Sequence, residues 1–352
     1  MKVLLTHERF LPEWGGGGET IVYETARHLM RRGVDVRVLT TGDPAVRVYD
    51  GIPTERIPIH RYQMNLSASR IAERAGWADV LQTFNYHACW PSLQAGLRTE
   101  KPVVCGFLGL FGDAWLELKG RTLGPLFRSW EKHLVRLPFS RLCFLSEFSR
   151  RQAIALGSTE TRSRVVCPGV ALEAFGPREH KENLVLFVGK FSRRKGVYDV
   201  LEVARALPEY RFLMIGWGPE EDALRRLAPS NTTIERGEPG HPPVEAYARA
   251  RVLLFPSRAE TLGLVIPEAM ASGCAVVSCV PVDFHGVRVE PGQVPDMIAG
   301  VRKLMADEGY FTDCSAANRE SSRFYHWERY TDDLLQVYEQ ALGEPAGKAA
   351  AR

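Results

Sequence analysis

The sequence predicts an α/β protein with two doubly wound, Rossmann-like domains in tandem. Short apolar runs alternate with longer amphipathic segments from one end of the chain to the other, which is the pattern of repeated strand–helix units. The alternation pauses once, at residues 175–182, where a polar stretch with a Gly-Pro pair carries no periodicity. A chain of 352 residues is also too long for one ordinary domain and suits two.

The first domain is expected over residues 1–175. Its candidate strands are runs rich in Val, Leu and Ile with little alternation, which is typical of parallel strands buried on both faces. A helical pattern over Thr20–Arg32 follows the first strand and stops at Gly33, a residue type that commonly ends helices. The expected strands are Lys2–Thr6, Val34–Thr40, Asp79–Thr83, Pro102–Phe107, Arg141–Leu145 and Arg164–Cys167.

The second domain is expected over residues 183–324, where the same rhythm restarts after the linker. Since open parallel sheets bind ligands at the carboxyl ends of their strands, we expect one cleft served by both domains. A last amphipathic helix is expected over residues 325–342. The strands are Leu184–Gly189, Arg211–Ile215, Thr232–Arg236, Val252–Phe255 and Ala275–Cys279, and the helices are Gly196–Ala206, Glu220–Leu227, Val244–Ala250 and Leu264–Ala271.

The composition is that of a globular protein and gives no sign of a nucleic-acid partner. Its net charge is only +3, although the excess of Lys and Arg lies in the first half. The seven Cys form no C-x-x-C pair and most lie in apolar stretches, which indicates buried thiols in a reducing compartment. We find neither a signal-peptide pattern nor an apolar run that spans a bilayer. We therefore expect a cytoplasmic protein, with peripheral contact to an anionic inner membrane face as a further hypothesis.

Four consecutive glycines, Gly15–Gly18, lie between the first strand and the first helix. Glycine permits close backbone approach, and free N–H groups at a helix start attract anions, so this loop is predicted to bind a diphosphate. The spacing matches neither a dinucleotide-binding G-x-G-x-x-G nor a P-loop. The alternative interpretation is a merely flexible loop.

Two further motifs follow strands of the second domain. Residues 190–196, KFSRRKG, place four cations after a buried strand, where they would stabilise negative charge on a diphosphate leaving group. A solvated loop is the ordinary interpretation of such a charge run. Gly216 and Gly218 flank Trp217 in a G-x-G that is weak evidence alone, since the following Pro-Glu simply suits a helix start.

The strongest motif spans residues 256–273, PSRAETLGLVIPEAMASG. Its two carboxylates, Glu260 and Glu268, bracket a glycine loop and are placed to accept hydrogen bonds from sugar or ribose hydroxyls. The N–H groups of Thr261, Leu262 and Gly263 are predicted to face phosphate. Two ordinary glutamates are the alternative, but they leave unexplained a charge within the apolar run LVIPEAMASG.

Together these motifs resemble those of the retaining glycosyltransferases of family 4, which have the GT-B fold. The similarity covers nearly the whole chain and is most specific over residues 183–280, where VGKFSRRKG, IGWGPEE and PSRAETLGLVIPEAMASGCAVV are similar to consecutive donor-site motifs. In the first half, GGGGET resembles the family's Gly-Gly-x-Glu loop. The segment that begins with Trp327 resembles the helix that returns to the N-terminal domain.

The resemblance implies a role for each matching residue. Glu260 would bind the hydroxyls of the donor sugar, and Glu268 would bind those of the ribose. Lys195 and Lys190, the latter standing where the family usually has Arg, would bind the diphosphate and, with Glu260, would be the catalytic residues. The backbone near Arg236 and Gly237 would meet the base. The remaining donor-binding residues would be Gly17 and Gly18 from the first domain, and Gly216, Thr261, Leu262 and Gly263 from the second.

The implied reaction moves a hexose-type sugar from a nucleotide-diphosphate sugar to a glycan, lipid-linked or small-molecule acceptor. Retention is expected through front-face attack, with the leaving phosphate helping to deprotonate the acceptor. The nucleotide sugar is a co-substrate, and no cofactor is implied. The sequence contains no D-x-D motif for a metal, so we expect a metal-independent enzyme.

The chain departs from the family pattern at two places. The family usually has a His-Gly pair after the strand Pro102–Phe107, and this chain has Leu108-Gly109. His87 and Asp113 are candidate substitutes for that histidine. The segment at residues 280–290 is also short beside the family's Gly-Gly-x-x-Glu segment and the loop that follows it, so the rim of the donor site is expected to be remodelled.

Three alternatives remain open at this point. The missing histidine favours a catalytically impaired nucleotide-sugar-binding protein or partner subunit. The Rossmann-like pattern alone is compatible with a nicotinamide oxidoreductase, although no G-x-G-x-x-G is present. A glycan-binding protein without catalysis would leave the donor motifs without a purpose.

The segment at residues 116–142 has two interpretations. Phe127, Trp130 and Leu134 share one helical face and are interspersed with cations. Most amphipathic helices in globular proteins bury such a face against their own domain. The other interpretation is that the face and the cations contact an anionic membrane beside a lipid-linked acceptor.

Overall fold

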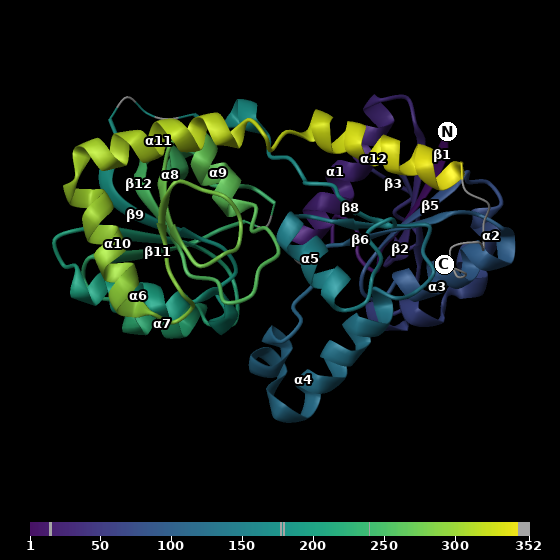
Figure 1. The fold of residues 1–352 in the computed structure, drawn as a ribbon, viewed down its shortest axis with the longest axis horizontal. Helices are drawn as coiled ribbons and strands as arrows, with labels where there is room; N and C mark the ends of the chain where they lie inside the picture. The colour runs from purple at the N-terminus through teal and green to yellow at the C-terminus, as the bar shows by residue number, and fades with distance from the viewer. Residues whose placement is uncertain (14–15, 177, 179, 239, 344–352) are drawn as a thin grey trace. The chain divides into compact units, whose positions relative to one another are not determined.

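The chain forms two compact α/β units, each built on one sheet (Figure 1). The first unit comprises Met1–Pro168 and the chain from Trp327 onward, and the second comprises Gly169–His326. This computed structural model describes residues 1–13, 16–176, 178, 180–238 and 240–343. The predicted fold class, two Rossmann-like α/β domains, is confirmed.

The sheet of the first unit has eight strands in the order β3-β4-β2-β1-β5-β6-β7-β8, and all pairs but β3–β4 are parallel. Six strands lie within two residues of their predicted bounds. They are β1 (Lys2–Thr6), β2 (Asp35–Thr41), β5 (Val80–Phe84), β6 (Val103–Phe107), β7 (Arg141–Phe144) and β8 (Ser163–Val165). The hairpin of β3 (Val48–Tyr49) and β4 (Ile52–Ile57) was not predicted. Along β4 buried and exposed residues alternate, so the strand lacks the continuous apolar run of its neighbours.

Helices of the first unit fill the connections between these strands. The first helix begins at Gly17, before the predicted Thr20, so two of the four glycines lie in its first turn. The helices are α1 (Gly17–Arg31), α2 (Ala68–Ala75), α3 (Cys89–Thr99), α4 (Ala114–Leu134) and α5 (Glu147–Ala155), with the 3-10 turn η1 (Arg61–Leu66) before α2.

The C-terminal helix α12 (Trp327–Leu342) packs on the first unit, beside α1. The Tyr330 hydroxyl lies 2.6 Å from the hydroxyl of Thr25, and the Trp327 ring stacks on the His28 ring with centroids 5.5 Å apart. Tyr338 is fully buried on the same helix, and its hydroxyl has no hydrogen-bond partner among the described residues.

The sheet of the second unit is parallel, in the order β11-β10-β9-β12-β13-β14. The predicted strands and helices are present within two residues of their expected bounds, and β14, α10 and α11 follow them. The strands are β9 (Glu182–Val188), β10 (Arg211–Gly216), β11 (Thr232–Arg236), β12 (Ala250–Phe255), β13 (Ala275–Ser278) and β14 (Gly286–Arg288). The helices are α6 (Val197–Ala206), α7 (Glu221–Leu227), α8 (Val244–Arg249), α9 (Val265–Ala271), α10 (Val294–Ala306) and α11 (Glu308–Ser322).

The boundary between the units falls before the linker expected at residues 175–182. The Phe175 ring packs edge-on against the buried Tyr247, with centroids 5.8 Å apart, and the Val170 N–H donates to the carbonyl of Tyr325. These contacts hold residues 169–175 to the second unit. Pro177 and Glu179 of the expected linker lie outside the described residues.

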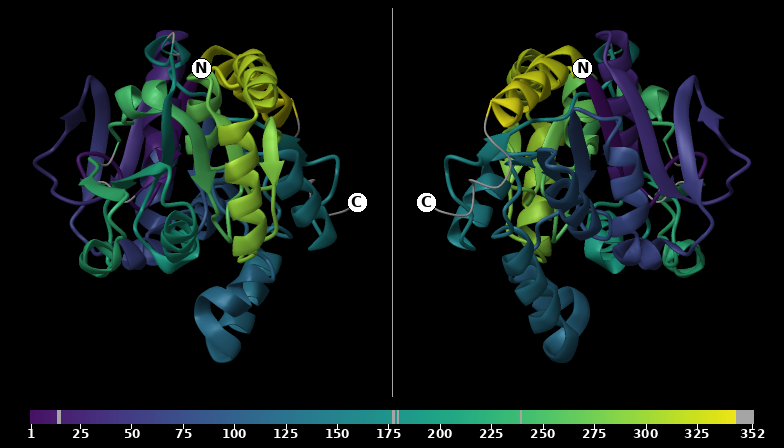
Figure 2. Two further views of the ribbon diagram at one scale, coloured as in Figure 1. Left: turned by 90° about the vertical axis from the view of Figure 1, so that its left-hand side faces the viewer. Right: turned by 90° about the vertical axis from the view of Figure 1, so that its right-hand side faces the viewer.

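Helix α4 leaves much of its apolar surface exposed. It is two helical pieces joined at Gly120, whose φ is 72°, and it stands clear of the sheet of its own unit (Figures 1 and 2). Leu134 is buried, but Phe127 and Trp130 keep 37% and 38% of their surface exposed, so the interpretation of one fully buried face is wrong. Leu116, Leu123 and Leu126 are exposed as well.

The remaining expectations about composition concern thiols and membrane spans. All seven cysteines are free, and all but the half-buried Cys279 are buried, as the apolar surroundings predicted. Over the described ranges, no helix has both the length and the apolar character needed to cross a bilayer.

The two tyrosines of α12 allow a matched stability test. Tyr330→Phe removes a buried hydrogen bond and should lower the free energy of unfolding by about 0.5–1.5 kcal/mol. Tyr338→Phe removes a buried hydroxyl that has no partner, so it should be neutral or stabilising. Urea unfolding of both variants checks this, and equal destabilisation by the two would contradict the packing of α12 described above.

Candidate functional site

The order of strands in the second unit singles out one place for a ligand. Strand β9 lies between β10 and β12, so the chain leaves β9 on one side for β10 and later returns on its other side as β12. Ligands of open parallel sheets bind at the carboxyl ends of the strands, where the order reverses. The loops that follow β9 and β12 contain the KFSRRKG run and the motif at residues 256–273.

An ion pair joins these two loops. The ammonium of Lys195, after β9, bonds to carboxylate oxygen Oε1 of Glu260, after β12. The Ser257 hydroxyl donates to the same oxygen at 3.0 Å, and an Arg194 guanidinium nitrogen lies 3.5 Å from it. The side chains of Lys195 and Glu260 are only 14% and 12% exposed, so the structure brings these two predicted catalytic residues together in a largely desolvated pair.

Burial and pairing act in opposite directions on the Glu260 carboxylate. Burial by itself raises its pKa, but the charges of Lys195 and Arg194 outweigh burial and hold the pKa below the ordinary value. Burial also lowers the pKa of Lys195, while Glu260 opposes that change. The carboxylate is therefore ionised at neutral pH and keeps its charge only beside the cations.

The third residue predicted to be catalytic, Lys190, acts on this pair through its charge, which adds to the lowering of the Lys195 pKa. It follows β9 directly and its side chain is exposed. Arg236, expected near the base, is likewise exposed at the end of β11 and lies 3.6 Å from a carboxylate oxygen of Glu221. Both are at the carboxyl edge of the sheet, but neither is held by the Lys195–Glu260 pair.

The backbones of neighbouring strand ends approach each other closely at Gly216. A Cβ atom on this residue would lie 1.9 Å from the carbonyl oxygen of Gly189, and the Gly216 carbonyl accepts the Gly237 N–H at 2.9 Å. Only glycine fits at this position. The packing of β9, β10 and β11 accounts for Gly216, and the donor-binding role of Gly216 and Gly237 stays a prediction.

The loop before α9 offers backbone donors beside Glu260. Thr261 and Leu262 are buried, and Gly263 has a left-handed φ of 69°, which glycine adopts without strain. Within the described part of the chain, the N–H groups of Leu262 and Gly263 donate to no protein acceptor. They are therefore available to an anionic ligand, and their contact with a phosphate stays a prediction.

Glu268 is held by a residue that the sequence did not reveal. One oxygen of its carboxylate accepts the Tyr247 hydroxyl at 2.7 Å, and this partner explains the charge within an apolar run. Burial raises the pKa of Glu268 to about 7, and the Tyr247 hydrogen bond only partly opposes that shift. The carboxyl group therefore changes its charge near neutral pH.

In the first unit the order of strands reverses between β1 and β5. Gly17 and Gly18 begin α1, after β1, and a Cβ atom on Gly18 would lie 3.3 Å from a methyl carbon of Leu108. Gly18 is thus packed against the residue that replaces the usual histidine. Gly15, also part of the predicted loop, lies outside the described residues.

The loop that carries Leu108 is held from two sides. The Leu108 N–H donates to the side-chain oxygen of Asn85 at 2.9 Å, and the Asn85 amide donates to the carbonyl of Gly109 at 2.6 Å. On the other side, the buried Glu131 of α4 accepts the N–H groups of Phe111 and Gly112. A carboxylate on α4 therefore fixes the connection that follows β6, a function that nothing in the sequence near Glu131 indicated.

The two candidate substitutes for histidine lie in different surroundings. His87 follows β5, and the Asn65 amide donates to its Nδ1 at 3.0 Å. Burial lowers its pKa, which favours a neutral ring with the proton on Nε2. Asp113 is instead exposed and pairs with Arg128 at 2.8 Å, so only His87 lies at the strand-order reversal.

Comparison with known proteins identifies both halves of the chain. Residues 16–169 match the family model of the glycosyl transferase 4-like domain, and residues 182–307 match that of the glycosyl transferases group 1. The D-inositol 3-phosphate glycosyltransferase of Mycobacterium tuberculosis is 29% identical to 94% of this chain, over 80% of its own length. Sulfoquinovosyl transferase SQD2 of Arabidopsis thaliana is 31% identical to 52% of this chain, and the match spans only 41% of that protein.

Solved structures share the fold over nearly the whole chain. Sucrose-phosphate synthase from Thermosynechococcus elongatus is similar with a TM-score of 0.82 and 18% identity, over 96% of this chain and 98% of that one. HepE from Anabaena, solved in complex with UDP-glucose, has a TM-score of 0.78 and 16% identity, over 96% of this chain and 99% of its own.

The pKa of Glu268 predicts a pH dependence of stability. Between its ordinary value of 4.5 and about 7, the unfolded chain loses this proton while the folded chain keeps it. The free energy of unfolding should therefore fall by about 1–3 kcal/mol as the pH rises through this interval, and then level off. Glu268→Gln stays neutral and should lack this decline, so above about pH 7 it should be more stable than the wild type.

Urea unfolding across this pH range, with the exposed Glu238→Gln as control, tests the assignment. Parallel pH profiles for the wild type and Glu268→Gln would show that Glu268 is ionised throughout and would contradict it.

Proposed function

Because this chain belongs to the family 4 type of glycosyltransferases and has their GT-B fold, we propose that it transfers a hexose-type sugar from a nucleotide-diphosphate sugar. The proposed acceptor is a glycan, a lipid-linked sugar or a small molecule, and the proposed transfer is retaining and metal-independent. The observation that carries the proposal is the Lys195–Glu260 ion pair at the strand-order reversal of the second sheet. The UDP-glucose complex of HepE supports a nucleotide sugar as the donor.

Donor binding would exchange the partners of the ion pair. The diphosphate takes the Lys195 ammonium, and hydroxyls of the donor sugar replace it on the Glu260 carboxylate. The ammonium then faces the diphosphate, and the carboxylate keeps Ser257 and the Arg194 charge beside the sugar hydroxyls, so neither buried charge is left alone in a desolvated site. Lys190, which is exposed just after β9, places a second positive charge beside the diphosphate on its solvent side.

The other predicted residues would hold the nucleotide. The ionised Glu268 carboxylate accepts hydrogen bonds from the ribose hydroxyls. Its pKa of about 7 means that this ionised form is available at neutral pH. The free N–H groups of Leu262 and Gly263, with Thr261 in the same loop, face the phosphates. Gly216, Arg236 and Gly237 border the base, and the diphosphate role of Gly17 and Gly18 stays part of the proposal.

The chemistry follows from where negative charge develops. As the bond between the sugar C1 and the phosphate oxygen breaks, that oxygen gains charge, and Lys195 and Lys190 stabilise it. The acceptor oxygen attacks C1 from the same face and forms the new bond, and its proton passes to the departing phosphate oxygen. The sugar therefore keeps its anomeric configuration, and the protein needs no carboxylate nucleophile.

Leu108 favours a second candidate, a protein that binds the nucleotide sugar without transferring it. Its apolar side chain occupies the place of the usual histidine and cannot accept a hydrogen bond or a proton. Under the proposed function, the neutral His87 after β5 supplies the polar group on the acceptor side. Release or transfer of the sugar distinguishes the two candidates.

Turnover should persist in excess EDTA, because cationic side chains neutralise the diphosphate without a metal. The measurement is release of nucleoside diphosphate from a panel of nucleotide sugars, with and without chelator. Glu260→Gln should lower turnover by about a hundredfold, since it removes a charge that orients the sugar. Loss of turnover on chelation that magnesium or manganese restores would contradict metal independence, and binding with no sugar release would favour the second candidate.

Helix α4 extends the proposal to a membrane-bound acceptor. Leu123 and Leu126 are 51% and 65% exposed, and Lys119, Arg121, Arg128, Lys132 and Arg136 lie on the same helix or just beyond it. Exposed apolar residues among cations match the boundary of an anionic bilayer, where each Lys or Arg contributes about 1 kcal/mol. We therefore propose salt-sensitive, peripheral binding of α4 to anionic lipid.

Sedimentation with anionic vesicles should carry the protein into the pellet at low salt and release it at high salt. Leu123→Ser with Leu126→Ser should weaken this binding about tenfold or more, because two leucine side chains that would insert into the apolar part of the bilayer are removed. Leu97→Ser with Leu227→Ser, which removes two leucines that are 53% and 50% exposed elsewhere, is the control. Protein that stays in the supernatant at low salt, or equal loss in the control, would contradict the role of α4.

A further inference from the structure

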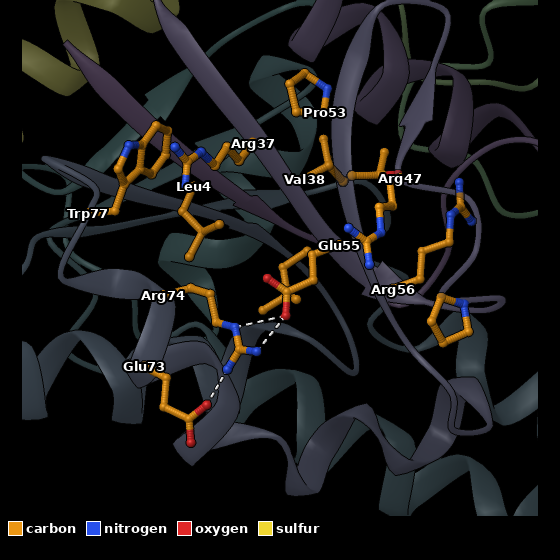
Figure 3. A pocket seen from close by; sticks show the side chains of 13 residues that line it. Leu4, Arg37, Val38, Arg47, Pro53, Glu55, Arg56, Glu73, Arg74 and Trp77 are labelled. Carbon is orange, nitrogen blue, oxygen red and sulfur yellow. Dashed lines mark hydrogen bonds and ion pairs between the residues drawn. The ribbon is translucent and has the colours of Figure 1, made fainter.

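A second candidate binding site lies entirely within the first unit, along β2 and β4 of its sheet. It is a cavity of about 600 Å³ bordered by β2, β4 and the end of α2 (Figure 3). Arg37 is the third residue of β2, and Trp77 lies just before β5 begins at Val80. The lining of the cavity runs along β2 and β4 as far as Pro44 and Arg47, which follow the end of β2, and it does not include Gly18, His87 or Leu108.

The cavity has an excess of positive charge. Four arginines line it, Arg37, Arg47, Arg56 and Arg74, against two acids, Glu55 and Glu73. The lining therefore carries two positive charges more than negative ones. Anions are attracted to such a concave surface more strongly than to isolated surface cations.

Two of the four arginines are already occupied. Arg74 pairs with Glu55 at 2.6 Å and also with Glu73, as Figure 3 shows. Arg56 is buried and donates to the backbone carbonyls of Phe10, Leu11 and Val46. These contacts hold β4, α2 and the loop after β1 in place, so both residues have a structural role.

The other two arginines lack acidic partners. Across the residues that the structure describes, neither Arg37 nor Arg47 forms an ion pair or a side-chain hydrogen bond. The Arg37 guanidinium lies over the Trp77 ring, 4.0 Å from its centroid, so its planar face is fixed while its N–H edge stays available. Such an edge binds phosphate or carboxylate oxygens in pairs.

The size and apolar parts of the cavity point to an organic anion rather than an inorganic one. Its volume lies within the range of about 300–1,000 Å³ of small-molecule sites. Trp77, Pro44 and Pro53 add flat or apolar surface, which suits a ring. A phosphate monoester carries a charge of about −1.5 to −2 at neutral pH, which matches the two uncompensated arginines.

We propose that this cavity binds a phosphate monoester of a ring-containing small molecule, a sugar phosphate or a nucleoside monophosphate, at a site separate from the donor motifs. Arg37 binds the phosphate beside Trp77, which contacts the ring, and Arg47, on the other side of Glu55 (Figure 3), contributes through its charge. This site does not depend on the transfer reaction, so it can be tested separately from the proposed function.

Calorimetry at low salt tests the proposal with glucose 6-phosphate, AMP and inorganic phosphate as probes. One of the two esters should bind with a stoichiometry of one, more tightly than inorganic phosphate. Arg37→Gln with Arg47→Gln should weaken that binding about tenfold or more, because charge-assisted hydrogen bonds are lost. Arg70→Gln with Arg98→Gln removes the same charge from exposed positions of the first unit outside the cavity and should have no effect.

Three results would overturn the site. They are an absence of ester binding, equal weakening in the two double variants, and binding that Lys190→Gln with Lys195→Gln abolishes while the cavity variant keeps it. The last result would assign the phosphate to the donor motifs. Inorganic phosphate that binds as tightly as both esters would show a simple anion site and overturn the proposed ligand class.

Discussion

The central constraint in this protein is a largely desolvated ion pair between two loops that are distant in sequence. Lys195 and Glu260 remain charged because they neutralise each other, with Arg194 as a second cation beside the carboxylate. The pair forms because β9 and β12 are neighbours in the sheet, and their following loops meet where the strand order reverses. The glycines around it serve the same arrangement: Gly216 lets the ends of β9 and β10 approach, and Gly263 turns the chain from β12 into α9.

The loop after β6 in the first unit is held in a different way. In the first unit, a neutral amide and a buried carboxylate, Asn85 and Glu131, hold the loop after β6 through its backbone. Glu131 lies on α4, the helix with exposed apolar surface, so the proposed membrane surface and the loop beside Leu108 belong to one connected element. Contact of α4 with lipid would therefore act on a loop at the carboxyl edge of the sheet through a few hydrogen bonds.

Much of the fold could be predicted from local pattern, because parallel strands buried on both faces read as continuous apolar runs. The hairpin β3–β4 escaped prediction because Pro53, Glu55 and Arg56 interrupt any such run. Periodicity also showed which residues of α4 share a face but not what covers that face, so the exposure of Phe127 and Trp130 required the structure. Among the site residues, the Glu260 and Glu268 motif was evident, but the partners of these carboxylates, Lys195 and Tyr247, are set by sheet topology rather than by spacing.

The central claim is that Lys195 and Glu260 exchange partners when the donor binds. Calorimetry on Glu260→Gln, with a nucleoside diphosphate and its sugar derivative that both bind the wild type, tests it most directly. The variant frees Lys195, so the account predicts unchanged or tighter binding of the diphosphate. In the wild type the sugar derivative should bind more tightly than the nucleoside diphosphate, and in Glu260→Gln this difference in affinity should be lost. Equal weakening of both ligands would contradict the exchange and make the pair a purely structural bridge between β9 and β12.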